Sequence, residues 1–323
     1  MKSYIVKQKD LNSRMLSRSG GIFAAISDQV LAQGGVIYGA GMDKNFNVVH
    51  KRAVNATERD ELRGSKYVQS DIYNAYRLAC EDLKAGRLVL FTGTPCQVDG
   101  IKALCPKGCE EHLVCMDIVC HGVPSPRVWN DYKTYMERKY HGKIEKIDFR
   151  NKERFGWSDH WETVTINGKE HDSQVYMKMF YEHTFLREAC YVCPYKNLQR
   201  ISDISIADAW GVENANPEFD DNRGVSLVLI NTPKGEKWFS DSLEECNYIE
   251  CDIEKYMQEP LRKPFQKPDN TEQVWKEYNE TSFDEFVKRH YKEPLLSVIK
   301  RSLKRKIKGI VPKSLWNRLR GWC

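Results

Sequence analysis

Residues 87–96 of this chain read RLVLFTGTPC. The first five residues are an apolar run of the kind that forms a buried strand, and TGTP is a tight polar loop that leads into a helix ending near Leu104. A strand, a short loop and a helix in this order place the loop at the carboxyl end of a sheet, where ligands collect in α/β folds. The stretch therefore predicts an α/β fold with a binding loop at residues 92–96.

The same layout recurs once further along the chain. Residues 113–119 form a second apolar run, residues 120–124 are its loop, and Ser125-Pro126 begins a helix as a cap and a first-turn proline. Loops that follow adjacent strands meet at one edge of a sheet. We therefore expect Cys96 and Cys120 to lie close together.

The rest of the pattern divides the chain into three parts. Residues 1–86 alternate helical and extended signals and predict a small N-terminal α/β domain. Residues 87–235 predict a larger domain with a mixed sheet, to which further strand signals contribute at 144–149, 161–166, 204–207 and 226–230, with Asn167-Gly168 as a hairpin turn. Residues 236–323 are mainly polar and helical in character. The predicted fold class is therefore mixed α/β with a helical C-terminal tail.

Composition excludes several classes of protein. The chain has 323 residues, of which 41% are hydrophobic and 29% charged, so it can bury a sizeable core. It shows neither a signal peptide nor an apolar run of about 18 residues, so we expect a cytoplasmic protein. Eleven cysteines without a secretory signal favour reduced thiols and metal ligation over a disulfide framework.

The net charge of +5 is concentrated near the C-terminus. Residues 300–320 carry many Lys and Arg residues and no acid, so the rest of the chain is mildly acidic. Apolar residues recur at about four-residue spacing over residues 299–323, as in a basic amphipathic helix. This tail predicts peripheral contact with an anionic membrane surface at the inner face, or packing against the body or a partner protein. A nucleic-acid surface is not indicated.

Four thiols stand out by their spacing. Cys190 and Cys193 form a Cys-x-x-Cys pair, which supplies two ligands to either tetrahedral zinc or an iron–sulfur cluster. Zinc sites usually show two such pairs, whereas Cys96 and Cys120 stand alone on separate loops, which favours a cluster. A redox-active pair beside two buried strand-end cysteines remains an alternative. The cysteines of residues 105–115 are more typical of packing or of solvent-facing positions.

Seven motifs follow one another between about residues 13 and 235, namely SGG at 19–21, GSKYVQS at 64–70, GTPCQ at 93–97, DIVCHGVPSP at 117–126, FRNK at 149–152, CYVC at 190–193 and DAWG at 208–211. This series resembles the coenzyme F420 hydrogenase/dehydrogenase beta-subunit family. Members of that family are iron–sulfur flavoproteins, so the resemblance implies a [4Fe-4S] cluster, FAD and electron transfer to or from a deazaflavin or related acceptor. On the matching positions, the resemblance makes the cluster ligands Cys96, Cys120, Cys190 and Cys193.

The chain resembles a short form of that family. Many relatives carry an N-terminal ferredoxin-like module, but no cysteine precedes Ser17 here. The resemblance then implies a separate ferredoxin-type protein as electron donor and a small molecule as acceptor. Short forms are familiar from bacteria that do not make the deazaflavin coenzyme, often near surface-polysaccharide genes, so the acceptor stays open. The alternative function is a non-redox accessory protein of surface-polysaccharide biosynthesis whose four thiols bind zinc.

A flavin dinucleotide requires hydrogen-bond donors for its phosphates. The stretch at residues 17–21 offers hydroxyls, backbone N–H groups and the positive end of a helix dipole through Ser17, Ser19, Gly20 and Gly21, although a plain helix cap has the same pattern. Lys66 is a candidate cation near the flavin pyrimidine. The other candidates for contact with the flavin are Tyr67, Gln69, Ser70, Thr92, Gly93 and Thr94.

Charged residues further along the chain complete the predicted site. Arg150 and Lys152 follow a strand, and Arg200 with Asp203 follows the cysteine pair. Such groups grip a phosphate or an acidic deazaflavin side chain, or form surface salt bridges. His121, beside Cys120, is the candidate catalytic residue, as a proton donor to flavin N5 or a hydrogen-bond partner of a cluster sulfur.

Overall fold

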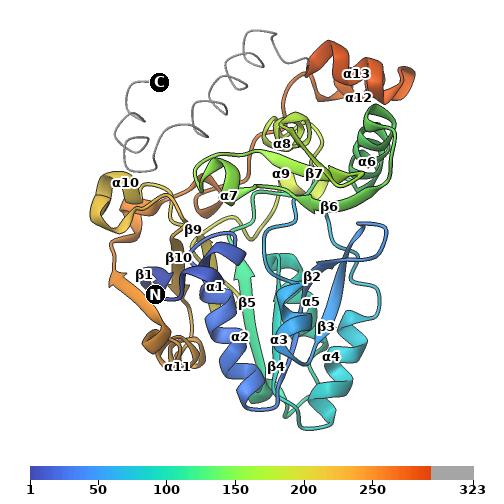
Figure 1. Cartoon of the computed structure of the whole chain (residues 1–323). Helices are drawn as coiled ribbons and strands as arrows, with labels where there is room; N and C mark the ends of the chain where they lie inside the picture. Colours follow the sequence, from blue (N-terminus) through green and yellow to red (C-terminus); the bar gives the residue numbers. More distant parts are fainter. Residues whose placement is uncertain (292–323) are drawn as a thin grey trace. The chain divides into compact units, whose positions relative to one another are not determined.

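The computed structural model describes residues 1–291 (Figure 1). Its main element is an eight-stranded sheet in the order β11-β1-β10-β9-β5-β4-β2-β3. The strands are β1 (Lys2–Gln8), β2 (Val36–Met42), β3 (Val48–Ala53), β4 (Val89–Gly93), β5 (Leu113–Ile118), β9 (Ile204–Asp208), β10 (Ser226–Ile230) and β11 (Cys246–Glu250). The four central strands β2, β4, β5 and β9 are parallel, and the outer pairings are antiparallel. The predicted mixed α/β fold class is confirmed.

The sheet crosses the domain boundary expected at residue 86. β2 pairs in parallel with β4, so strands from residues 1–86 and from residues 87–235 belong to one sheet. Residues Met1–Glu272 accordingly form one compact unit. The edge strand β11 also lies where the sequence is helical in character. Its pairing partner is β1, more than 200 residues away, and no local pattern signals such a pairing.

Helices cover both faces of the sheet. Alternate residues of a strand point to opposite faces, so Leu90 packs in the core under α2 (Ile22–Ala32) and α11 (Pro233–Asp241), whereas Phe91 packs under α4 (Ala75–Lys84) and α5 (Pro95–Leu104). The remaining helices of this unit are α1 (Leu11–Leu16), α3 (Ala56–Asp60), α6 (Pro126–Tyr140), α7 (Lys152–Phe155), α8 (Val175–Tyr181), α9 (Glu188–Tyr191) and α10 (Val212–Ala215). As predicted, Ser125 caps α6, and its Oγ accepts from the Arg127 N–H at 3.2 Å.

Three further strands form a second, antiparallel sheet that shares no strand with the first. It consists of β6 (Ile144–Asp148), β7 (Glu162–Ile166) and β8 (Lys169–Ser173). The predicted strands at residues 144–149 and 161–166 therefore exist, but they form a sheet of their own. The predicted hairpin turn joins β7 to β8, with φ of 52° at Asn167 and 69° at Gly168, a conformation that Asn and Gly adopt readily.

Gly20 fits where no side chain could. A Cβ at this position would lie 2.0 Å from the Val6 carbonyl oxygen and 2.6 Å from the Ser226 amide nitrogen. The chain before α2 thus runs directly against β1 and β10, which brings residues 17–21 to the carboxyl end of β9. The SGG motif is therefore required by packing as well as by helix initiation.

The second unit begins at Gln273, and only its first part is described. It contains most of α12 (Thr271–Glu280) and all of α13 (Phe283–His290). No helix within residues 1–291 is long and apolar enough to cross a membrane. The basic tail at residues 299–323, and the membrane contact predicted for it, lie outside the described residues.

Candidate functional site

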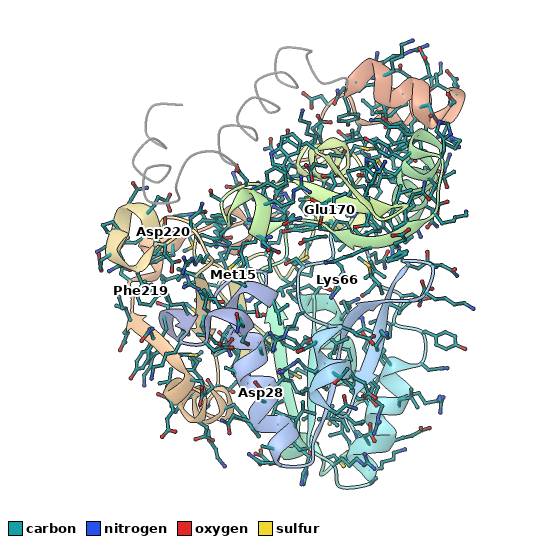
Figure 2. All side chains as sticks on the ribbon, in the orientation of Figure 1. Met15, Asp28, Lys66, Glu170, Phe219 and Asp220 are labelled. Carbon is teal, nitrogen blue, oxygen red and sulfur yellow. The ribbon has the colours of Figure 1, made fainter. Side chains whose placement is uncertain are left out.

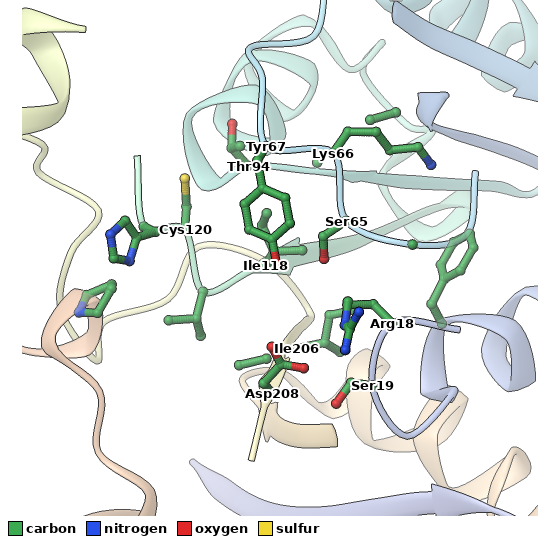
Figure 3. Close-up of a pocket in the computed structure, with 18 of the residues that line it drawn as sticks. Arg18, Ser19, Ser65, Lys66, Tyr67, Thr94, Ile118, Cys120, Ile206 and Asp208 are labelled. Atoms are coloured by element: carbon green, nitrogen blue, oxygen red, sulfur yellow. The ribbon is translucent and has the colours of Figure 1, made fainter. Parts of the chain in front are cut away.

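A cavity of about 600 Å³ opens at the carboxyl ends of the central parallel strands. Thr92 and Gly93 of β4, Ile118 of β5 and Asp208 of β9 contribute to its wall. In Figure 3, Cys120 lies on one side of Tyr67, and Arg18, Ser19 and Asp208 lie on the other. The cavity therefore has a thiol-bearing end and a charged end.

Most of the residues predicted from the sequence line this cavity. They are Ser17, Ser19, Gly21, Lys66, Tyr67, Ser70, Thr92, Gly93, Thr94, Arg150, Cys120 and His121. Lys152 lines a second cavity of about 350 Å³, which shares Arg18, Lys66 and Arg150 with the first. Three residues around the second cavity, Met15, Lys66 and Glu170, come from α1, the segment after α3 and β8 (Figure 2).

Gly20 and Gln69 are not among the residues that line either cavity. The Gly20 N–H donates to Ser226 Oγ at 2.9 Å, so it is occupied within the sheet. The Gln69 side-chain oxygen accepts from Arg187 Nη1 at 2.5 Å. Both residues therefore have partners within the chain, and their predicted contact with the cofactor stays a prediction.

Arg200 and Asp203 also lie away from both cavities. Arg200 Nη2 is 2.8 Å from Asp117 Oδ2, and both side chains are almost fully buried. Asp203 accepts from the Cys115 N–H at 2.8 Å and from the Thr232 hydroxyl at 2.7 Å. These contacts tie the segment before β9 to β5 and to the start of α11, and the predicted cofactor contact of both residues stays a prediction.

The charged end of the cavity holds two guanidinium groups and one carboxylate, that of Asp208. Arg150 Nη1 donates to Asp208 Oδ2 at 2.7 Å and to the Tyr67 hydroxyl at 3.1 Å. The Arg18 guanidinium donates to the Arg150 carbonyl and to the Trp157 carbonyl, the latter at 3.2 Å. Burial lowers the pKa of Arg18, and the charge of Arg150 lowers it further. This excess of positive charge over one carboxylate suits an anionic ligand.

Arg18 is a site residue that was not predicted from the sequence. The available signal was a cation between two serines in SRSGG, directly before a helix. Buried Nε atoms of both Arg18 and Arg150 lack a hydrogen-bond partner among the described residues. A ligand oxygen at the charged end would satisfy such donors.

Two lysines near the cavities have a lowered pKa. Burial lowers the pKa of Lys152 to about 7, and the charges of Arg18 and Arg14 add to the effect. Burial also lowers the pKa of Lys66 to about 7. Both ammonium groups are held by backbone carbonyls, at 2.7 Å for Lys152 to Arg14 and 2.8 Å for Lys66 to Arg63. A bound anion would raise the pKa of each lysine by favouring its charged form.

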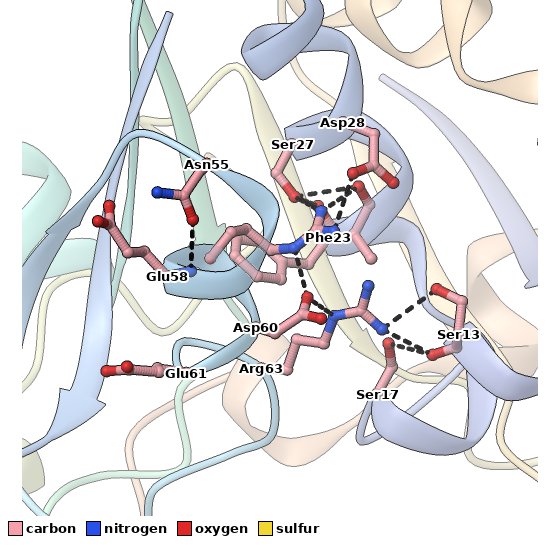
Figure 4. Close-up of polar contacts among 12 residues, drawn as sticks. Ser13, Ser17, Phe23, Ser27, Asp28, Asn55, Glu58, Asp60, Glu61 and Arg63 are labelled. Carbon is pink, nitrogen blue, oxygen red and sulfur yellow. Dashed lines mark hydrogen bonds and ion pairs between the residues drawn. The ribbon is translucent and has the colours of Figure 1, made fainter.

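Polar contacts tie together two segments that line the cavity (Figure 4). Arg63 Nη1 donates to the Ser13 carbonyl at 3.1 Å, and Arg63 Nε pairs with Asp60 Oδ1 at 2.7 Å. The Ser17 hydroxyl donates to the Ser13 carbonyl at 3.0 Å. The wall formed by residues 17–19 is therefore connected to the wall formed by residues 62–68.

The four predicted cluster ligands interact electrostatically with one another. Burial raises the pKa of Cys120 to about 12, and the charges of Cys96 and Cys190 raise it further. Burial likewise raises the pKa of Cys190, and the charges of Cys193 and Cys96 add to the effect. Thiols from the first turn of α5, the loop after β5 and the α9 region therefore lie close enough to influence one another electrostatically.

Lys196 lies in the same neighbourhood. Burial lowers the pKa of its ammonium, while the charges of Cys120, Cys190 and Cys193 raise it. Its Nζ donates to the His121 carbonyl at 2.9 Å.

Among residues 1–291, no three His, Cys, Asp or Glu side chains are arranged as ligands of a single metal ion.

His121 pairs with a second histidine. Its Nε2 is 2.6 Å from His183 Nε2, so one ring donates to the other. Burial lowers the pKa of His121 to about 3, and the neighbouring His183 and Lys196 lower it further. His121 is therefore neutral at pH 7, and only its Nδ1 remains to face another group.

Aromatic rings form one wall of the cavity. Ring centroids are 4.3 Å apart for Phe265 and His121, 5.3 Å for His121 and Tyr181, 4.9 Å for Tyr181 and His160, and 5.7 Å for His160 and Trp210. All five residues line the cavity, which suits a planar ligand. Most of this wall was not predicted from the sequence, because its members are spread over more than 140 residues and resemble ordinary core aromatics.

The buried histidines make stability sensitive to acid. Burial lowers the pKa of His50 to about 4 and that of His160 to about 4. In the unfolded chain each titrates near about 6.5, so between these values the unfolded chain binds more protons than the folded protein. We expect the free energy of unfolding to fall as pH drops from about 6.5 to about 4, by as much as ~3 kcal/mol for His50. Denaturant unfolding across this range measures the slope.

The His50→Asn variant provides the control for this prediction. It removes one titrating ring, so its free energy of unfolding should depend less steeply on pH than that of the wild-type chain between about pH 6.5 and 4. Parallel slopes for the two proteins would contradict the assignment to His50.

Comparison with known proteins gives one family and one fold. The family model for the C-terminal part of the beta subunit of coenzyme F420 hydrogenase/dehydrogenase matches residues 86–255. A chain of the F420-reducing [NiFe] hydrogenase complex from Methanosarcina barkeri is structurally similar, with a TM-score of 0.55 and 17% identity over 77% of this chain and 81% of that chain. That similarity shows the fold alone. No curated protein matches this chain.

Proposed function

Because the chain belongs to the coenzyme F420 hydrogenase/dehydrogenase beta-subunit family, we propose that it is an iron–sulfur flavoprotein oxidoreductase. Cys96, Cys120, Cys190 and Cys193 would hold a [4Fe-4S] cluster and the cavity would hold FAD. Together these cofactors would supply electron transfer between a protein donor and a diffusible acceptor, a deazaflavin or a related compound. The observation that carries the proposal is a single cavity with Cys120 at one end and Arg18 and Arg150 at the other.

The donor set suits a thiolate-ligated cluster. Cys96, Cys120, Cys190 and Cys193 supply four sulfurs, which is the ligand number of a [4Fe-4S] cluster. Lys196 adds a positive charge that interacts with three of these cysteines and would offset the negative charge of thiolates. The electrostatic coupling among the four thiols supports the assignment, because the segment from the first to the last of them spans more than 90 residues.

The charged end suits the diphosphate of a dinucleotide. Arg18 and Arg150 would bind phosphate oxygens; Ser17 lines both cavities, and Lys152 lines the smaller one. The smaller cavity offers room for the nucleotide half of FAD next to these residues. In this arrangement the aromatic wall would pack against the planar ring system and exclude water from it.

Tyr67 is placed to orient a ligand between the two ends. A guanidinium only donates, so the Tyr67 hydroxyl accepts the bond from Arg150 and can donate its own proton to a ligand atom. His121 can use only Nδ1 for the same purpose. FAD, when bound, supplies the conversion between one-electron and two-electron transfer.

The electron donor would approach where the thiols reach the surface. Cys96 is exposed, and Val192, between the paired cysteines, is 77% exposed. Electron transfer between proteins requires a short path, so a ferredoxin-type partner would dock over this edge. The cavity end near Arg18 is left for the small-molecule acceptor and FAD.

Anaerobic isolation of the full chain tests the proposal. We expect a brown protein with broad absorbance near about 400 nm, iron and sulfide in the ratio of one [4Fe-4S] cluster per chain, and one FAD released per chain. Iron, acid-labile sulfide, zinc and released flavin are measured on the same sample. A colourless protein that contains zinc and no flavin would contradict the proposal and support the structural-zinc alternative.

A further inference from the structure

A chain of hydrogen bonds runs behind the β4–α5 loop. His50, in β3, has Nε2 at 3.0 Å from the Thr92 carbonyl oxygen and Nδ1 at 2.9 Å from Ser70 Oγ. Gln97 Nε2 donates to the same Ser70 Oγ at 2.8 Å, and the Thr94 N–H donates to Gln97 Oε1 at 3.0 Å. The side chains of His50, Ser70 and Gln97 are all buried.

Each hydrogen bond in this chain has a defined direction. A carbonyl oxygen only accepts, so His50 Nε2 carries the proton that binds Thr92. Nδ1 is then the acceptor, and the Ser70 hydroxyl donates to it. Ser70 Oγ in turn accepts from the Gln97 amide, which leaves Oε1 of Gln97 for the Thr94 N–H. The neutral Nε2–H form of His50 therefore determines the orientation of every group up to Thr94.

Packing around the chain leaves little room for other arrangements. A Cβ at Gly93 would lie 2.9 Å from Gln97 Oε1 and 3.3 Å from His50 Nε2. The His50 ring stacks on Phe91 with centroids 5.4 Å apart and planes at 17°. Burial lowers the pKa of His50, which keeps the ring neutral at pH 7. His50 itself is not among the residues that line the cavity.

We propose that His50 is a positioning residue that holds the β4–α5 loop in place through Thr92, Ser70 and Gln97. The loop carries the Thr92–Thr94 wall of the cavity and leads into the first turn of α5, where Cys96 lies with its Sγ 3.1 Å from Thr94 Oγ1. His50 thereby sets the position of one proposed cluster ligand without touching it. The inference about cluster binding rests on the proposed function, whereas the inference about the loop does not.

The loop inference is tested by the alkylation rate of Cys96. The full-length chain is isolated from iron-limited cells, treated with iodoacetamide, and mapped by peptide mass spectrometry, with Cys109 of the same molecules as internal reference. In His50→Ala, the ordered first turn no longer holds the positive end of α5 at the Cys96 sulfur. Cys96 is already exposed, so a looser loop would not make its sulfur more accessible to iodoacetamide. Without the positive end of the helix nearby, its reaction should be slower, and we expect the ratio of Cys96 to Cys109 alkylation to fall about two- to fivefold.

Companion variants separate positioning from a general loss of structure. Ser70→Ala removes the middle link of the hydrogen-bond chain but leaves the His50 ring in the core. It should also lower the ratio of Cys96 to Cys109 alkylation. His50→Gln keeps a donor for the Thr92 carbonyl and should restore part of the wild-type ratio. His112→Ala, at an exposed histidine, should leave the ratio unchanged. Circular dichroism verifies that each variant is folded.

An unchanged ratio in folded His50→Ala and Ser70→Ala would overturn the positioning role. In the anaerobically isolated proteins, His50→Ala should also lose its iron to a chelator faster than wild type. A wild-type chain without a cluster would reject the proposed function alone, because the alkylation ratio still decides the role of His50.

Discussion

The Cys120→Ser variant of the full chain is expected to lose its iron–sulfur cluster. The Cys120 thiol is partly buried and interacts with the charges of Cys96 and Cys190, so it lies inside the set of four proposed ligands. Serine preserves the shape of the side chain but replaces the thiolate that binds iron. We expect iron and sulfide per chain to fall close to zero, with loss of the absorbance near about 400 nm, and the same result for Cys193→Ser.

Cys109→Ser is the matched control for this experiment. Cys109 is also partly buried, but it packs with the core residues beneath α4 and α5, away from the proposed ligands. The iron content of the Cys109→Ser protein should equal that of the wild-type chain. Equal loss of iron in Cys109→Ser and Cys120→Ser, or full retention in both, would contradict the assignment of the ligands.

We expect Arg200→Met to lower the free energy of unfolding more than any of the other variants does. Arg200 is the ion-pair partner of Asp117 at 2.8 Å, the Asp117 side chain has no exposure, and its Oδ1 has no partner among the described residues. Removing one member of a buried ion pair leaves an uncompensated charge, which costs about 3–5 kcal/mol. Urea unfolding at pH 7 measures the change in the free energy of unfolding.

The pH dependence of that loss tests its cause. Burial raises the pKa of Asp117 even with Arg200 beside it, so without Arg200 the carboxyl group should bind a proton more readily. The stability difference between Arg200→Met and wild type should therefore be smaller at pH 5 than at pH 8. Arg77→Met removes an exposed pair with Glu81 and should cost only about 0.5 kcal/mol at either pH. A loss that is equal at both pH values would indicate a packing effect instead.

Local signals in the sequence identified the elements that carry the site. The apolar run, polar loop and first-turn proline at residues 87–96 correspond to β4 and α5, and Ser125-Pro126 begins α6. The Asn167-Gly168 turn and the SGG start of α2 also follow from residue type, because they depend on left-handed φ values and on helix caps. Each of these features involves residues within a few positions of one another.

Several site residues had no local signal. Arg18, His160 and Phe265 reach the cavity from three segments that are more than 100 residues apart. His50 reads as one residue of an edge strand, and its bonds to Ser70 and Thr92 depend on how three segments pack. An aromatic or charged residue in a cavity wall has the same local pattern as one in the core or on the surface, so its type alone does not place it.

The sequence by itself determined the family, the mixed α/β class and the strand–loop–helix units that place ligand-binding loops at one edge of a sheet. Only the tertiary structure decided that residues 1–86 share a sheet with the rest, that Arg200 and Asp203 have internal partners, and that Arg18 and Arg150 together form the charged end of the cavity. The reason is physical. Caps, turns and hydrophobic periodicity arise from neighbouring residues, whereas strand order, buried ion pairs and cavity walls depend on contacts between residues far apart in the chain.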